Sequence, residues 1–174
     1  RELSHVIGDA RPRAAIIDEA SRVEQISKIN QDIHRLSPLL ELPEGKIPEL
    51  DVAPPGAPAL ICYTSGTTGR PKGVPRSVRA ERIAAASVIA HLRYRFGERL
   101  LGAMPMFHTM VIRNLLCSTM LSGAFVNMRG FDAGGALSLI EAEQVTALFL
   151  VPTMFHDMLG REDFAARDTG SVRN

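Results

Sequence analysis

The sequence predicts an α/β fold with a mainly parallel sheet and flanking helices. Its 174 residues are 45% hydrophobic and 22% charged, a composition typical of a chain that buries a globular core. Beyond residue 58, short apolar segments of strand length alternate with amphipathic stretches of helix length. Such alternation is typical of βαβ units, whose parallel strands are covered by helices on both faces. We therefore expect one α/β domain or part of one.

The first part of the chain predicts a helix, a strand and a second helix. Leu3, Val6 and Ile7 share one helical face, and the apolar run at 14–17 has the length of a buried strand. Apolar residues then recur at intervals of three and four between positions 23 and 36, which predicts an amphipathic helix over that range.

A proline-rich stretch divides the chain. Residues 43–58 contain five prolines and two glycines, which disfavours both a helix and a central strand. We expect a linker there, after a partial α/β segment at 1–42 and before a longer α/β portion at 59–174. All three are predicted to lie within one incomplete domain.

The portion at 59–174 reads as a regular alternation of strands and helices. Asp132 and Thr153 are suitable N-caps, and Gly123 is suited to the C′ position of the preceding helix. The predicted strands are 59–63, 100–104, 124–128 and 147–151, and the predicted helices are 79–91, 110–121 and one after each of the two caps.

Charge and composition exclude several classes of function. The formal net charge is +1, so the basic excess that drives nucleic-acid or anionic-membrane binding is lacking. Cys62 and Cys117 are far apart and lack the spacing of a zinc site or a disulfide framework. No apolar run reaches the roughly 18 residues of a membrane span. We expect a cytoplasmic protein that binds neither nucleic acid nor a structural metal.

The segment 63–73, Tyr-Thr-Ser-Gly-Thr-Thr-Gly-Arg-Pro-Lys-Gly, carries the most chemical information. It follows a predicted buried strand, where ligands bind in α/β sheets. Its glycines allow backbone amides to approach an anion, its hydroxyls offer donors and its lysine supplies a positive charge. These properties predict a polyphosphate-binding loop. The residues concerned are Thr64, Ser65, Gly66, Thr67, Thr68, Gly69 and Lys72, with Gly73 at the end.

Three other interpretations of this segment are weaker. A flexible surface turn would account for glycine and threonine, but not for their combination with a lysine at a strand end. A P-loop requires Gly-Lys-Ser/Thr, whereas Lys72 lies between Pro71 and Gly73. The Gly-x-Gly-x-x-Gly spacing of dinucleotide-binding folds is also absent.

The segment 63–73 resembles the signature loop of the adenylate-forming superfamily, which includes acyl- and aryl-CoA ligases. Pro105-Met106-Phe107-His108 resembles the Pro-x-Phe/Tyr-His segment of the CoA-ligase branch, and 148–153 resembles a later turn that ends in Val/Thr-Pro. Ser77-Val78 departs from the Ser/Thr-His that is common there. The family's later glutamate and its catalytic lysine are not found. The resemblance therefore implies an internal fragment of the large N-terminal domain, with 59–174 as its nucleotide-binding portion.

This resemblance implies a ligase that forms an acyl-adenylate from a carboxylate and ATP, then an acyl thioester with CoA. It implies ATP, Mg²⁺ and CoA as cofactors, and it assigns the loop residues, including Lys72, to the phosphates of ATP. No residue of this chain is assigned to a metal. A homo-oligomer is compatible with the sequence. The alternative is a non-catalytic nucleotide- or acyl-binding module that retains only the loop.

His108 is the second catalytic candidate after Lys72. Beside Phe107 and Met106, a histidine is more often a hydrogen-bonded core residue than a catalytic one. The resemblance instead implies a place between the adenylate pocket and the thiol tunnel, with a role in orientation and gating. Cys117 has no nearby base and is predicted to be a small buried hydrophobe rather than a nucleophile.

Overall fold

The computed structural model describes residues 2–17, 20–36, 52–64 and 70–174. They form two compact units, Arg1–Val78 and Arg79–Asn174. The predicted division into 1–42, 43–58 and 59–174 remains a prediction, since most of the expected linker lies outside the described residues.

The N-terminal part of the first unit combines two short helices with two short strands. Its elements are α1 (Glu2–Ala10), β1 (Ala14–Ile16), α2 (Ala20–Ile29) and β2 (His34–Leu36). β1 pairs in parallel with β2. A small core of Ile7, Ile26 and Ile33 holds the helices against the strands, as the amphipathic pattern predicts.

The predicted helix from 23 to 36 is wrong in its second half. α2 ends at Ile29, and the amide of Asp32 donates to the side-chain oxygen of Asn30 at 2.9 Å. Such a local side-chain bond replaces the helical hydrogen bonds and turns the chain. Ile33 then enters the core and the next three residues form β2.

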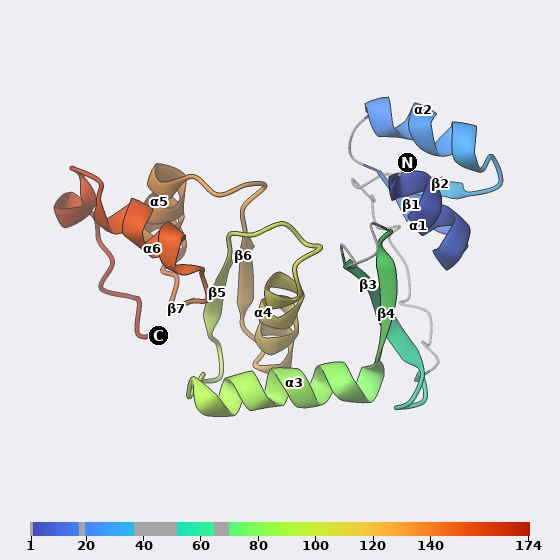
Figure 1. Cartoon of the computed structure of the whole chain (residues 1–174). Coiled ribbons are helices and arrows are strands. Elements are labelled where there is room, and N and C mark those ends of the chain that lie inside the picture. Colours follow the sequence, from blue (N-terminus) through green and yellow to red (C-terminus); the bar gives the residue numbers. More distant parts are fainter. Residues whose placement is uncertain (1, 18–19, 37–51, 65–69) are drawn as a thin grey trace, which may run out of the picture. The chain divides into compact units, whose positions relative to one another are not determined.

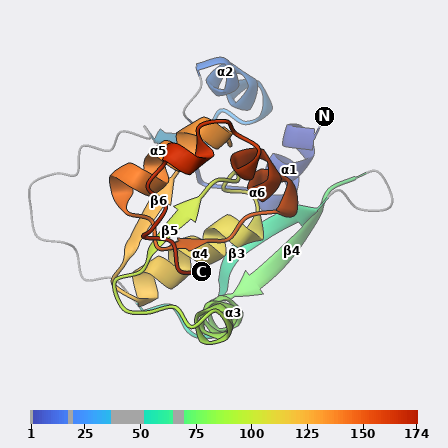
Figure 2. The same ribbon diagram turned by 90° about the vertical axis from the view of Figure 1, so that its left-hand side faces the viewer.

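A hairpin completes the first unit. β3 (Pro58–Thr64) pairs antiparallel with β4 (Lys72–Ser77), and Figure 2 shows the two strands side by side. The segment 59–63 is confirmed as a strand. The expectation that it is a buried strand of the parallel sheet is wrong, because it pairs antiparallel in a two-stranded hairpin and has no buried residue. β4 was not predicted: Lys72 and Gly73, expected in the loop, are its first two residues.

The second unit contains the predicted parallel sheet. Its strand order is β6-β5-β7, and both pairings are parallel. Figure 1 shows helices alternating with these strands along the chain. The elements are α3 (Val78–His91), β5 (Arg99–Gly102), α4 (Thr109–Met120), β6 (Ala124–Asn127), α5 (Ala133–Glu143), β7 (Ala147–Leu148), α6 (Pro152–Leu159) and the 3₁₀ helix η1 (Phe164–Ala166). The alternation read from the sequence is confirmed here.

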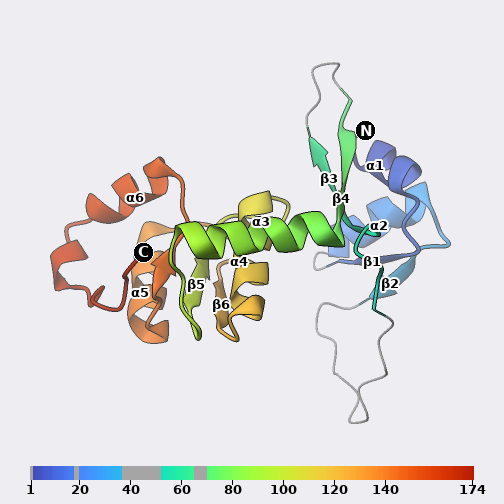
Figure 3. The ribbon, with the colours of Figure 1, turned by 90° about the horizontal axis from the view of Figure 1, so that it is seen from below.

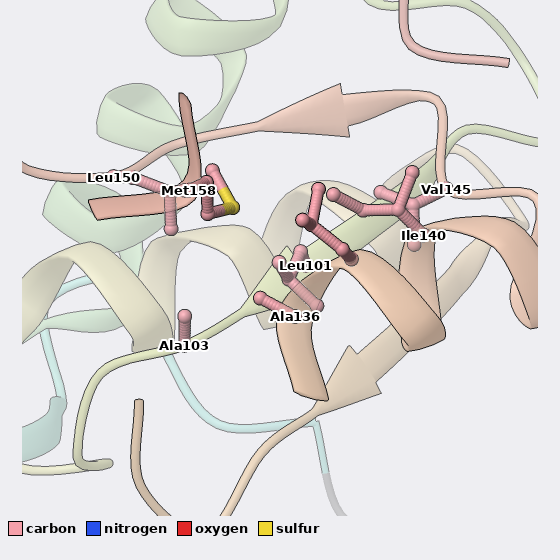
Figure 4. Packing of buried hydrophobic residues seen from close by; sticks show 8 residues of the cluster. Leu101, Ala103, Ala136, Ile140, Val145, Leu150 and Met158 are labelled. Atoms are coloured by element: carbon pink, nitrogen blue, oxygen red, sulfur yellow. The ribbon is translucent and has the colours of Figure 1, made fainter. Parts of the chain in front are cut away.

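The central strand β5 separates two hydrophobic clusters. Successive strand residues point to opposite faces, so Leu100 joins a cluster with Ala85 of α3 and Cys117 of α4. Leu101 joins the larger cluster on the other side, with residues of α5 and α6. Figure 4 shows Leu101 of this second cluster beside Ala136, and Ile140 beside Val145. Both faces of β5 are therefore covered.

The helix ends agree with the sequence in part. Asp132 caps α5, since its carboxylate accepts a hydrogen bond from the amide of Gly135 at 2.6 Å. Thr153 does not cap α6: the N-cap is Val151, and Pro152 occupies the first turn, where a missing N–H costs nothing. Gly123 lies one residue beyond its expected position, because Ser122 adopts the positive φ of 48° after α4.

Gly123 is required by close approach of the backbone. A Cβ at this position would collide with the carbonyl oxygen of Glu98. That carbonyl accepts the amide of Ala124 at 2.9 Å, which starts the pairing of β6 with β5. The glycine therefore lets α4 return directly to the sheet.

The chain's last two residues run beside β7. Arg173 donates its amide to the carbonyl of Thr146 at 2.8 Å, and Leu148 donates to the carbonyl of Asn174 at 2.8 Å. The Arg173 guanidinium also lies 2.9 Å from the carboxylate of Glu98, which is completely buried. An ion pair thus connects the residue before β5 to the segment beside β7.

Candidate active site

The β3–β4 hairpin brings two predicted site residues together. In the antiparallel register Thr64 lies opposite Lys72, and Tyr63 lies opposite Gly73. Both Thr64 and Lys72 are exposed, so the hydroxyl and the ammonium group are available to a ligand. The other predicted loop residues, Ser65, Gly66, Thr67, Thr68 and Gly69, lie outside the described residues.

Gly73 has a structural role that differs from the predicted one. A Cβ at this position would lie 3.0 Å from Cγ2 of Ile61 and 3.1 Å from Cζ of Tyr63. These separations are tighter than ordinary van der Waals contact, so the glycine makes room for the Tyr63 ring. The ring therefore lies across the partner strand at Gly73, the residue after Lys72.

Helix α1 contacts both strands of the hairpin near the paired residues. The Tyr63 hydroxyl donates to Oδ2 of Asp9 at 2.6 Å. Nε2 of His5 lies 2.8 Å from the carbonyl oxygen of Pro71, and it must carry the proton because a carbonyl only accepts. The sequence does not predict either contact. They join residues 54 and 66 positions apart, and no local pattern signals them.

The contact with Asp9 favours the protonated form of Tyr63. The hydrogen bond to Asp9, followed by burial and the carboxylate charge, raises the pKa of the Tyr63 hydroxyl above its ordinary value. A group with a raised acidic pKa remains a donor at neutral pH. The Tyr63–Asp9 bond is therefore a neutral donor to a charged acceptor, one of the stronger kinds of hydrogen bond.

His108 lies at the start of α4 in the second unit. It is the N-cap residue of this helix, but its side chain does not accept a capping hydrogen bond. The imidazole is exposed and lies against the Phe107 ring, with centroids 4.7 Å apart. A core histidine, the competing interpretation of this residue, is therefore wrong.

The surroundings of His108 are suited to an apolar ligand with a polar end. The segment between β5 and α4 leaves the carboxyl end of the central parallel strand, the usual ligand edge of an α/β sheet. Phe107 is 76% exposed and Met106 is 44% exposed on this segment. An imidazole beside exposed apolar side chains can orient a polar group while the apolar surface binds the rest of a substrate.

Cys117 and Arg113 lie on the same helix, α4, where the cysteine is buried and the arginine is half-buried near a carboxylate. Cys117 is completely buried, and burial raises the pKa of its thiol to about 11, although the charge of Arg113 lowers it slightly. It is thus a small buried hydrophobe, as predicted. Arg113 lies 3.9 Å from the carboxylate of Glu81 on α3. That partner explains why the arginine is not a free anion-binding group.

The described part of the chain offers no cluster of metal-ligating side chains. Within 2–17, 20–36, 52–64 and 70–174, no group of three or more histidine, cysteine, aspartate or glutamate side chains could hold a metal ion. Among these described residues, no such cluster of side chains surrounds a position for Mg²⁺. The helices in the same ranges include none with the length and apolar content needed to cross a membrane.

Comparison with known proteins assigns the family. The model of the AMP-binding enzyme family matches residues 1–174, and the chain therefore belongs to that family. It is 30% identical to a feruloyl-CoA synthase from Amycolatopsis over 179 residues, which cover 99% of this chain and 35% of the relative. A 4-chlorobenzoate–CoA ligase from Pseudomonas is 40% identical over 102 residues, 57% of this chain and 19% of the relative.

Solved structures agree on the fold. The inhibitor-bound N-terminal domain of FACL13 from Mycobacterium tuberculosis superposes with a TM-score of 0.85 and 26% identity, covering 99% of this chain and 46% of that one. O-succinylbenzoate CoA synthetase from Bacillus subtilis, solved with ATP and magnesium, gives a TM-score of 0.79 and 25% identity over 99% of this chain and 35% of that one. The chain thus spans about a third of the length of the curated relatives first matched.

Proposed function

We propose that this chain is part of an ATP-dependent acid–thiol ligase. In the first step a substrate carboxylate oxygen attacks the α-phosphorus of ATP and pyrophosphate leaves, which gives an acyl-adenylate. In the second step the thiolate of CoA attacks the acyl carbonyl carbon, and AMP leaves with the bond electrons. The products are an acyl thioester, AMP and pyrophosphate.

The observation that carries this proposal is the exposed Thr64–Lys72 pair at the hairpin end. In phosphoryl and nucleotidyl transfer the protein chiefly positions groups and neutralises charge. We assign the Lys72 ammonium group and the Thr64 hydroxyl to the β- and γ-phosphates of ATP. Ser65, Gly66, Thr67, Thr68 and Gly69, which connect the strands, are assigned to the same phosphates.

His108 is assigned to the acyl side of the reaction. Its exposed imidazole and the adjacent Phe107 lie at the ligand edge of the sheet, where they can orient the carboxylate and then the incoming thiol. Similarity to ligases named for feruloyl, chlorobenzoate and long-chain fatty acyl substrates supports a carboxylate substrate with a large apolar part. Aryl and fatty acyl groups both satisfy this description.

Mg²⁺ accompanies ATP in this proposal, without a ligand from the described residues. We propose a cytoplasmic location because ATP and CoA are cytoplasmic metabolites. Self-association into a homo-oligomer remains a prediction. The alternative of a non-catalytic module is not favoured, since the relatives matching 99% of the chain carry enzyme names.

Carboxylate-dependent exchange between pyrophosphate and ATP tests the first step in the full-length enzyme that carries this chain. Lys72→Ala is expected to lower exchange and raise the KM for ATP by about 10- to 100-fold, because one charged hydrogen bond to phosphate is lost. The matched control is Lys28→Ala, which removes an exposed lysine paired with Glu24 on α2 and is expected to change neither value. Unaltered ATP use in Lys72→Ala would refute the assignment, and ATP binding without exchange would favour the non-catalytic module.

A further inference from the structure

Two side chains on one face of α1 contact the two strand ends that carry Thr64 and Lys72. His5 and Asp9 are four residues apart and therefore lie on the same side of the helix. Asp9 accepts from the hydroxyl of Tyr63, the residue before Thr64. His5 donates to the carbonyl of Pro71, the residue before Lys72. Figure 3 shows α1 beside the hairpin strand β4.

Tyr63 is held at both ends of its side chain. Its ring lies over Gly73, where the missing Cβ leaves space, and its hydroxyl reaches Asp9 at 2.6 Å. A tyrosine side chain has only two rotatable torsions before its hydroxyl, so these two contacts restrict both. The backbone at Thr64, one residue further, is thereby restricted from the β3 side.

Pro71 restricts the other strand end. Its ring fixes φ near −65°, and it has no N–H, so its carbonyl is its only polar backbone group. His5 occupies that carbonyl from α1 at 2.8 Å. Lys72 therefore follows a residue whose torsion is limited by its ring and whose peptide plane is held by the helix.

We propose that Asp9 and His5 are positioning residues that fix Thr64 and Lys72 for binding of the ATP phosphates. This proposal rests on the proposed function. Neither Asp9 nor His5 needs to touch the nucleotide. Asp9 acts through Tyr63, the neighbour of Thr64, and His5 acts through Pro71, the neighbour of Lys72. Donors held in place before the ligand arrives lose less conformational freedom on binding, so the contacts favour ATP affinity rather than carboxylate affinity.

The test measures ATP affinity by calorimetry, and the KM values for ATP and carboxylate in the exchange assay, on the full-length enzyme. Tyr63→Phe and Asp9→Ala are each expected to weaken ATP binding about fivefold, which corresponds to one hydrogen bond. The double variant is expected to be no worse than either single one, since both remove the same bond. The carboxylate KM is expected to stay unchanged.

Conservative variants separate positioning from general stability. Asp9→Asn retains an acceptor and His5→Gln retains a donor, so both are expected to recover most of the affinity lost in Asp9→Ala and His5→Ala. The matched control is Glu143→Ala, which removes a carboxylate that accepts from Arg99 at 2.6 Å in the second unit. Glu143→Ala is expected to lower thermal stability about as much as Asp9→Ala and His5→Ala do, but to leave ATP affinity unchanged.

Lys72→Ala on the same assays distinguishes the two proposals. Weaker ATP binding in Lys72→Ala with normal binding in Asp9→Ala and Tyr63→Phe would overturn the positioning proposal and leave the function standing. Equal loss of ATP and carboxylate affinity in the α1 variants would also overturn it, as a sign of general damage. Unchanged ATP binding in Lys72→Ala would overturn both proposals.

Discussion

The buried Glu98–Arg173 pair offers a test of how the second unit is held together. Glu98 is 0% exposed, and its carboxylate accepts from the Arg173 guanidinium at 2.9 Å. The side chain of Arg173 is 41% exposed. The variant Arg173→Ala removes the positive charge but leaves the carboxylate in the interior, where an unpaired charge is strongly unfavourable.

The expected cost follows from the remaining partners. Breaking a buried ion pair from one side typically costs about 3–5 kcal/mol. Glu98 still accepts the amide of Arg95 at 3.3 Å and lies 3.5 Å from the Asn174 amide, and water can enter where the half-exposed arginine was. We therefore expect Arg173→Ala to lower the free energy of unfolding by about 2–3 kcal/mol.

A double replacement tests the cause of this loss. Glu98→Met with Arg173→Met exchanges the pair for apolar side chains of similar size, and such exchanges are often close to neutral. We expect the double variant to recover to within about 1 kcal/mol of the parent. That recovery would show that the single variant suffers from an uncompensated charge, rather than from the loss of an attraction.

Chemical denaturation followed by far-ultraviolet circular dichroism provides the measurement. The control is Glu143→Gln, which removes the solvent-exposed pair with Arg99 and is expected to cost less than about 1 kcal/mol. The reasoning would be refuted if Arg173→Ala cost no more than this control. It would also be refuted if the double methionine variant were less stable than Arg173→Ala.

Three further predictions concern single positions. His108→Ala in the full-length enzyme is expected to slow one or both acyl-transfer steps and to leave ATP affinity nearly unchanged. A loss of ATP affinity as large as in Lys72→Ala would show that the assignment of His108 to the acyl side is wrong. Because burial raises the pKa of Cys117 from 9.0 to about 11, the fold favours the neutral thiol. The contribution of the neutral thiol to the free energy of unfolding is complete below pH 9 and is lost as the pH rises through 11. In Cys117→Ala this loss of about 2–3 kcal/mol at alkaline pH should disappear. Denaturation measured as a function of pH tests this expectation. Gly123→Ala is expected to lower the free energy of unfolding by about 3 kcal/mol or more, because the new Cβ meets the fixed Glu98 carbonyl. The control Gly130→Ala, where a Cβ has open space around it, is expected to leave the free energy of unfolding nearly unchanged.

The alternation of elements in the second unit could be predicted because each element carries its own signal. The apolar run at 100–104 contains most of β5, α5 begins at an aspartate cap, and both patterns are local. β4 has no such pattern. Its sequence contains Pro75, which usually argues against a strand, yet Pro75 pairs opposite Ile61. This strand exists because the hairpin brings it beside β3, and that information is not local.

The candidate site also combines residues with a local sequence signal and residues whose role depends on distant partners. Lys72 and Thr64 could be found because their residue types and spacing already suggest phosphate binding. His108 could be assigned only through the resemblance, and its exposure distinguishes it from a core histidine. Asp9 and His5 could not be found, because each is an ordinary helix residue whose proposed positioning role depends on a partner more than fifty positions away.

Lys72 in the first unit and His108 in the second unit are supported in different ways. The segment that carries His108 follows β5, which has a hydrogen-bonded strand on each side and a hydrophobic cluster on each face. Lys72 instead begins an edge of a two-stranded hairpin, and a hairpin of this kind has little stability of its own. It needs support from outside the sheet, and α1 supplies this through Tyr63 and Pro71. We therefore expect α1, a helix without catalytic chemistry, to contribute to the proposed nucleotide site. Within the part of the chain that the structure describes, the hairpin that carries Lys72 pairs with no third strand.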